Sequence, residues 1–216
     1  MRAPTLLVYG VACLAFLVTI PYTPYPGSVL VKALPILVLA GLARVSLEGR
    51  TRLFMTAALL LSACGDSLLE LDMFTPGLGA FLLAQLCYAW FFFSQRRDLK
   101  TLPYGRLLII VAIIPSVSIP VVAYAGNLLV PVTIYMSAIA LMGISAALYR
   151  QPSNILFIGA LLFIASDSMI GINRFVSPLP GASYAIMLTY YAAQLLILWG
   201  VMRAAQNTPN TGVIVR

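Results

Sequence analysis

The chain has 216 residues, of which 62% are hydrophobic and only 9% are charged. Soluble domains carry roughly 25% charged residues, so this composition excludes a soluble domain and indicates a single integral membrane domain. The sequence contains no histidine, which excludes histidine-bound zinc, Ser-His-Asp triads and Cys-His dyads as catalytic devices.

Eight apolar runs have the length of about 20 residues that a helix needs to cross the hydrocarbon core of a bilayer. They cover residues 4–20, 28–43, 52–71, 76–94, 104–123, 128–149, 154–173 and 182–203. We therefore predict an all-α membrane protein, a compact bundle of eight transmembrane helices. Residues 1–203 form its single domain and residues 204–216 a polar tail. The first run is expected to be a membrane helix rather than a removed signal peptide.

Basic residues concentrate in alternate connections between the predicted spans. Those on one side are Arg44, Arg50, Arg52, Arg96, Arg97, Lys100, Arg106, Arg150 and Arg203, while the connections on the other side hold only Arg174. Cytoplasmic loops carry an excess of Lys and Arg, so both termini are predicted to be cytoplasmic, in a bacterial inner membrane. The net charge of +7 is thereby attributed to topology, and no nucleic-acid motif accompanies it.

Two aspartates, Asp66 and Asp167, lie deep inside apolar runs. An ionisable group in the membrane marks a functional site unless it serves only as a packing device, here through an ion pair with Lys32 or Arg174. At a rise of about 1.5 Å per residue, both aspartates lie roughly 20 Å above the cytoplasmic edge. Glu70, one helical turn from Asp66, is expected to be solvated near the membrane edge.

Further polar residues reach the same layer from other predicted spans. Lys32 lies on the second span, Tyr190, Tyr191 and Gln194 lie on the eighth, and Asn173 and Arg174 lie above the layer. We predict one polar pocket at this depth. The tyrosines also suit helix packing or anchoring at the membrane surface, and Lys32 and Arg174 also suit snorkelling.

Five motifs occur in order along the chain: KALP at residues 32–35, GDSLL at 65–69, PVTIY at 131–135, SDSMIGINRF at 166–175 and YYAAQ at 190–194. Together they resemble the YhhN family, whose animal members include lysoplasmalogenases. The resemblance spans the second to the eighth predicted helix. It implies an eight-helix membrane hydrolase that cleaves the vinyl ether bond of a lysophospholipid. The chain departs from the family at Gln85, where a histidine is often found.

Vinyl ether hydrolysis needs one protonated group to deliver a proton to the alkene and one anion to stabilise the resulting cation and activate water. Two carboxyl groups in a low-dielectric site resist ionising together, so the pair Asp66 and Asp167 can supply both roles. Lys32, Asn173, Arg174, Tyr190, Tyr191 and Gln194 are the predicted substrate-binding residues. No metal or organic cofactor is expected, and the predicted partners are the lysophospholipid and membrane lipids.

Three other readings of the two aspartates stay open. An intramembrane aspartyl protease also uses two helix-borne aspartates, but its glycine-rich GxGD context matches poorly here. A small proton-coupled transporter would use the aspartates as proton carriers, although no internal repeat supports it. A non-catalytic lipid-binding protein would tolerate the loss of either aspartate. The headgroup, the chain length, the type of bond cleaved and the oligomeric state are not predicted.

Overall fold

The computed structural model describes residues 3–98, 101–150 and 154–206, and over these ranges it is built from helices. The long helices are α1 (Ala3–Thr19), α2 (Ser28–Ser46), α3 (Gly49–Glu70), α4 (Phe74–Ser94), α5 (Tyr104–Ala123), α6 (Leu129–Ala147), α7 (Asn154–Gly171) and α8 (Ala182–Gln206). Short helical turns η1 (Ile20–Tyr22), η2 (Gly126–Leu128) and η3 (Ile172–Val176) adjoin α1, α6 and α7. In the described residues, eight helical segments are long and apolar enough to span a membrane, which confirms the predicted multi-pass architecture.

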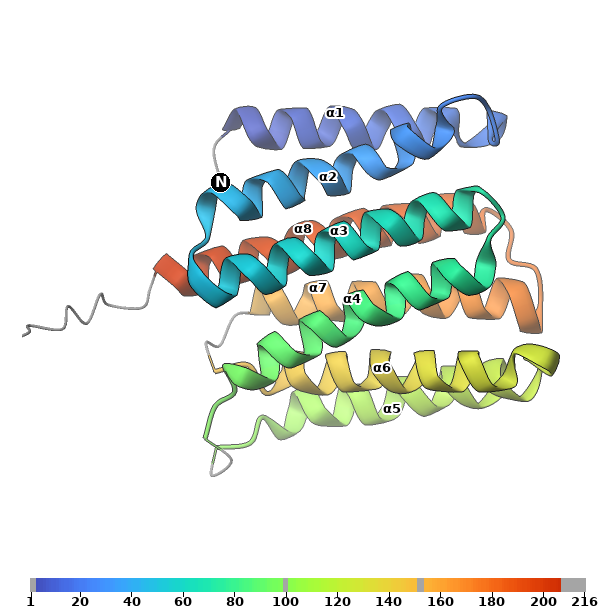
Figure 1. Ribbon diagram of the computed structural model, residues 1–216. Helices are drawn as coiled ribbons and strands as arrows, with labels where there is room; N and C mark the ends of the chain where they lie inside the picture. Colours follow the sequence, from blue (N-terminus) through green and yellow to red (C-terminus); the bar gives the residue numbers. More distant parts are fainter. Residues whose placement is uncertain (1–2, 99–100, 151–153, 207–216) are drawn as a thin grey trace, which may run out of the picture.

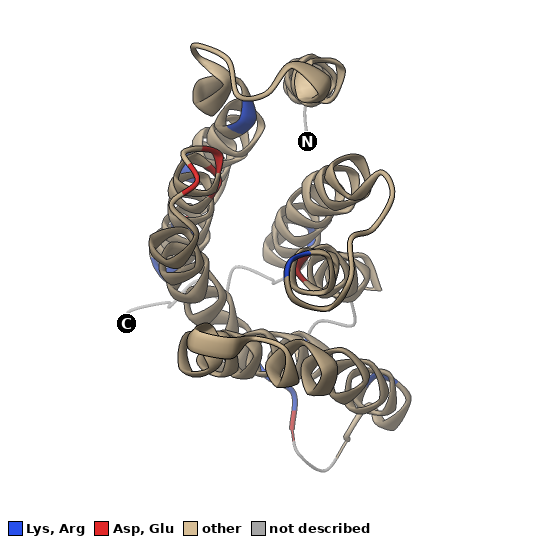
Figure 2. Cartoon of the chain, turned by 90° about the vertical axis from the view of Figure 1, so that its right-hand side faces the viewer, with Lys and Arg blue, Asp and Glu red and all other residues tan. Residues whose placement is uncertain are grey.

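The eight helices run side by side and alternate in direction, with the start of α1 and the end of α8 at the same end of the bundle (Figure 1). The pairs in closest contact are α7 with α8, α3 with α4, and α2 with α3. Helix α6 contacts both α4 and α5. Viewed along the helix axes, the helices form an open arc with the α7–α8 pair on its inner side (Figure 2).

Burial follows this arrangement. Half or more of the most apolar stretch of α7 and α8 is buried, against 11% for α5 and 17% for the segment that contains α1. The α7–α8 contact is close because it uses glycine: a Cβ on Gly200 would lie 2.6 Å from the Cβ of Leu156. Small residues let membrane helices approach one another closely. The result is a fixed pair at the centre of the bundle, with α1 and α5 at its edges.

The predicted spans agree with the observed helices to within a few residues, and Tyr104–Ala123 agrees at both ends. The largest difference in local structure is at the end of the seventh span. There the α-helix stops at Gly171, and η3 continues as a π-helical turn that contains Asn173 and Arg174. Helix α8 runs to Gln206, past its predicted end. Lys100 and residues 207–216 lie outside the described residues, so the division into a domain and a tail stays a prediction.

Candidate functional site

A polar cavity of about 260 Å³ lies between α1, α2, α3, α4, α7, η3 and α8. Asp66 and Asp167 both line it, although their side chains come from α3 and α7. Both residues are buried, with 3% and 6% of their surface exposed. The two predicted site carboxyls therefore share one void, at the end of the bundle away from the Arg-rich connections.

The Asp66 carboxyl is held by one tyrosine. The Tyr190 hydroxyl of α8 donates a hydrogen bond to Asp66 Oδ2 at 2.7 Å. The ring of Tyr190 is fixed by edge-on contacts with Phe81, at 5.9 Å between centroids, and with Phe163, at 5.6 Å. Gly65 makes room for this cluster, because a Cβ there would lie 2.5 Å from the ring of Phe81. The glycine beside Asp66 thus permits the close approach of α3 and α4.

Asp167 is held from two other helices. The Tyr135 hydroxyl of α6 donates to Asp167 Oδ2 at 2.6 Å, and Gln85 Nε2 of α4 donates to the same oxygen at 3.2 Å. The neighbouring Ser166 donates to the carbonyl of Ile186 at 3.1 Å and so ties α7 to α8. Gln85 and Tyr135 are not among the residues predicted for the site. The feature of the sequence that points to them is a polar side chain inside an otherwise apolar span.

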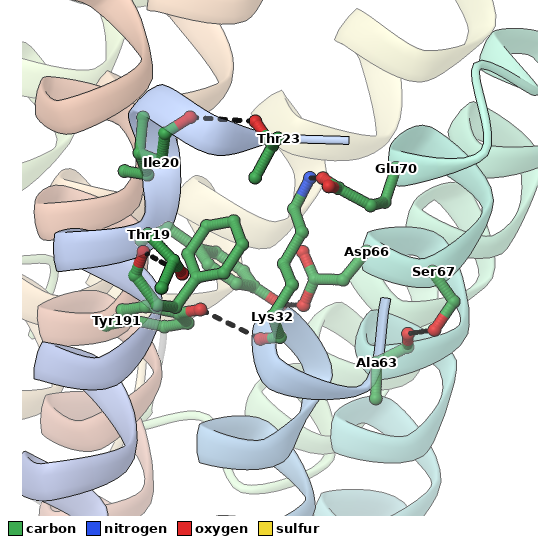
Figure 3. A network of polar contacts seen from close by, with 11 residues as sticks. Thr19, Ile20, Thr23, Lys32, Ala63, Asp66, Ser67, Glu70 and Tyr191 are labelled. Carbon is green, nitrogen blue, oxygen red and sulfur yellow. Dashed lines mark hydrogen bonds and ion pairs between the residues drawn. The ribbon is translucent and has the colours of Figure 1, made fainter. Parts of the chain in front are cut away.

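Lys32 pairs with Glu70 rather than with either aspartate. Its Nζ lies 3.1 Å from Glu70 Oε2, and the side chains are 13% and 9% exposed. Figure 3 shows the lysine rising from α2 beside Asp66 to reach Glu70. The expectation that Glu70 is solvated is therefore wrong, because α2 brings a cation against it and both residues line the cavity.

The outer rim of the cavity is formed partly by η3. The exposed guanidinium of Arg174 lies over the ring of Phe74, 3.8 Å from its centroid. Asn173 Oδ1 accepts a hydrogen bond from the backbone N–H of Leu179 at 2.8 Å and fixes the following loop. Both residues line the cavity, as does the exposed Asp72. Among the described residues, Arg174 forms no ion pair with a carboxylate, so its charge is available at the rim.

Tyr191 and Gln194, which were predicted to bind substrate, are not among the residues that line the cavity. The Tyr191 hydroxyl donates to the carbonyl of Lys32 at 2.8 Å and joins α8 to α2. Gln194 Oε1 accepts a hydrogen bond from the hydroxyl of Tyr88 at 2.6 Å and joins α8 to α4. In the described part of the chain, no group of three or more His, Cys, Asp or Glu residues is placed to hold a metal ion.

Residues 27–201 match the YhhN family, which is more than half of the chain. The chain belongs to the YhhN family. Among its relatives is a lysoplasmalogenase of Mycobacterium bovis, 36% identical over 90% of this chain and 79% of the relative. Human lysoplasmalogenase TMEM86B is 39% identical over 81% of this chain and 75% of its own length. Human lysoplasmalogenase TMEM86A is 31% identical over 88% and 84%. No solved structure shows significant similarity to the chain.

The match to the YhhN family confirms the resemblance inferred from the five motifs. It covers every helix that contributes a carboxyl to the cavity, since α3 and α7 lie within residues 27–201. Of the predicted substrate-binding residues, Lys32, Asn173, Arg174 and Tyr190 line the cavity beside the two aspartates. The range matched by the family thus includes all of these cavity residues.

Proposed function

We propose that this YhhN protein is a membrane-embedded lysoplasmalogenase. It hydrolyses the vinyl ether bond of lysoplasmalogens to a fatty aldehyde and a glycerophospho-alcohol. The observation that carries the proposal is the pair of buried carboxyls, Asp66 and Asp167, that line one cavity. The similarity to proteins named lysoplasmalogenase over most of their length supports the same reaction.

The reaction begins when the protonated carboxyl transfers its proton to the alkene carbon farther from the ether oxygen. The electron pair of the double bond forms the new C–H bond and leaves an oxocarbenium ion, which the ionised carboxylate stabilises. Water adds to the carbon next to the oxygen and gives up a proton to that carboxylate. The hemiacetal hydroxyl then gives its proton to the first carboxylate as the C–O bond to the glycerol breaks. The departing glycerol oxygen takes the proton held by the second carboxyl, which releases aldehyde and alcohol and restores both carboxyls. Asp66 and Asp167 take these two roles, and either of them can be the acid.

The remaining cavity residues suit the polar end of a lysophospholipid. Arg174 presents at the rim a guanidinium that pairs with no carboxylate of residues 3–98, 101–150 or 154–206, and guanidinium groups bind phosphate through paired hydrogen bonds. Lys32, paired with Glu70, lies deeper inside, and Asn173 shapes the rim through its bond to Leu179. Tyr190 acts on the reaction indirectly, through its hydrogen bond to the Asp66 carboxyl. We assign Tyr191 and Gln194 to the support of α8 rather than to substrate contact.

The test is mass spectrometry of a lysolipid panel after incubation with purified protein. Asp66→Asn and Asp167→Asn are each expected to abolish aldehyde release without loss of expression. Glu48→Gln is the matched control, because Glu48 is an exposed carboxylate just before α3, at the other end of the bundle. Turnover close to that of the unaltered protein in either aspartate variant would refute the pair. Cleavage of peptides, or proton-coupled flux without product, would favour the protease or the transporter.

A further inference from the structure

A second cavity, of about 30 Å³, adjoins the polar one and is almost wholly apolar. It lies between α3, α4, α5, α6, α7 and the turn η3. Its apolar wall includes Leu78, Val121, Val132, Met136 and Phe175. Its polar residues are Asp167 and Tyr135, whose hydroxyl donates to that aspartate at 2.6 Å. Apart from this one carboxyl, nothing in its lining suits a charged group.

The two cavities meet at Asp167. Asp167 lines both, as do four apolar residues, Leu69, Phe74, Phe81 and Ile170. On one side of this boundary lie Lys32, Glu70 and Arg174, and on the other side the lining is hydrocarbon. The site thus changes from charged to apolar across a candidate catalytic carboxyl.

We infer that the apolar cavity is the subsite for the hydrocarbon chain of the lysolipid, an assignment that rests on the proposed function. A vinyl ether lysolipid is divided in the same way as the site. Its scissile bond joins a charged glycerophospho group to a long apolar chain. With that bond at Asp167, the glycerophospho group occupies the polar cavity and the chain enters the apolar one. The reverse orientation would bury a phosphate without a cationic partner, which is strongly unfavourable.

The chain has to separate side chains as it enters, because the void itself is small. Met136 suits this role, since methionine is unbranched and adapts to irregular space. The wall toward α5 is tighter: a Cβ on Gly171 would lie 3.1 Å from both methyl groups of Val121. A larger side chain in this lining is therefore expected to exclude long hydrocarbon chains without displacing the Asp66 and Asp167 carboxyls.

The first experiment compares two substitutions on α6. Val132 is 3% exposed and lines the cavity, whereas Ile134, two residues later, is 52% exposed on the outer surface of the helix. Val132→Phe is expected to lower kcat/KM for a long-chain vinyl ether lysolipid by about tenfold or more relative to Ile134→Phe, since one methylene in a pocket changes rates by 10–200-fold. A short-chain substrate should lose much less. Equal losses in the two variants, or equal losses for both chain lengths, would overturn the assignment.

The second experiment reads binding without turnover. A non-hydrolysable 1-O-alkyl lysolipid with a photoreactive diazirine at its chain end is expected to label Leu78, Met136 or Phe175. Labels confined to exposed residues such as Ile134 and Leu141 would overturn the subsite. If the unaltered protein releases no aldehyde, the proposed function fails. The labelling then still decides whether a lysolipid chain occupies this cavity.

Discussion

Each candidate catalytic carboxyl has one oxygen held by the protein. Asp66 accepts its hydrogen bond from Tyr190 at Oδ2, and Asp167 accepts those from Tyr135 and Gln85 at Oδ2. Over the described residues, Oδ1 of both aspartates is without a protein donor. Orientation by buried, fixed donors is what positions an acid or base for proton transfer. The free oxygens are therefore the atoms that we expect to face substrate and water.

Removal of either tyrosine hydroxyl should slow the reaction without unfolding the protein. A hydrogen bond to a charged group contributes about 1.5–3 kcal/mol, so Tyr135→Phe and Tyr190→Phe are each expected to lower kcat roughly 10- to 150-fold. Tyr88→Phe is the control, because that buried hydroxyl donates at 2.6 Å to Gln194 and not to a carboxylate. Steady-state rates of aldehyde release decide the matter. Unchanged rates in the first two variants would contradict the orienting role.

The Lys32–Glu70 ion pair should act mainly on stability. Lys32→Met leaves the 9% exposed Glu70 carboxylate without its partner and should lower the free energy of unfolding by about 1–3 kcal/mol. The double variant Lys32→Met with Glu70→Gln should recover much of this loss, since no unpaired charge remains. Thermal unfolding in detergent measures the cycle. Strictly additive losses would show that the two side chains are not coupled.

At the level of the helices, hydropathy predicted where each span begins and ends but not which helices pack against one another. Tyr104–Ala123 was predicted at both ends because polar residues and Pro103 bound its apolar run. In contrast, the bonds from Tyr135 and Gln85 to Asp167 depend on α4, α6 and α7 meeting at one depth. Near-uniform apolar helices give little periodic signal for which face is turned inward. For the same reason, the sequence did not predict that Lys32 pairs with Glu70.

The close contact between α7 and α8 offers a test at this level. A Cβ on Gly200 would lie 2.8 Å from the backbone nitrogen of Leu156, which cannot move aside as a flexible side chain can. Gly200→Ala is therefore expected to destabilise the protein by about 1–3 kcal/mol. It should also reduce turnover, since α7 carries Asp167 and α8 carries Tyr190. Melting curves and aldehyde release give the two readouts.

Gly79→Ala is the matched control for that substitution. Gly79 also lies within a membrane helix, but a Cβ there would have no neighbour within 4 Å. Alanine is the better helix former by about 1 kcal/mol, so this variant should be neutral or slightly more stable. If both variants lost stability equally, the cause would be loss of glycine in general and not the α7–α8 contact.

For the whole molecule, charge separates the two ends of the bundle. Arg44, Arg50, Arg96, Arg97 and Arg203 lie toward the end that holds the α2–α3 and α4–α5 connections. The opposite end holds the polar cavity, with Lys32 paired to Glu70 and Arg174 on η3. The positive-inside rule predicts that the Arg-rich end is cytoplasmic and that the cavity therefore faces the other side of the membrane.

Labelling of single cysteines tests this orientation. Cys13, Cys64 and Cys87 are free thiols and would be replaced by alanine first. In that background, an impermeant maleimide should label Asp72→Cys, on the exposed α3–α4 turn beside the cavity, in intact cells. Glu48→Cys, exposed between α2 and α3, should react only after permeabilisation. The reverse pattern would place the cavity at the cytoplasmic surface, and lysolipid would then have to enter from the inner leaflet rather than the outer one.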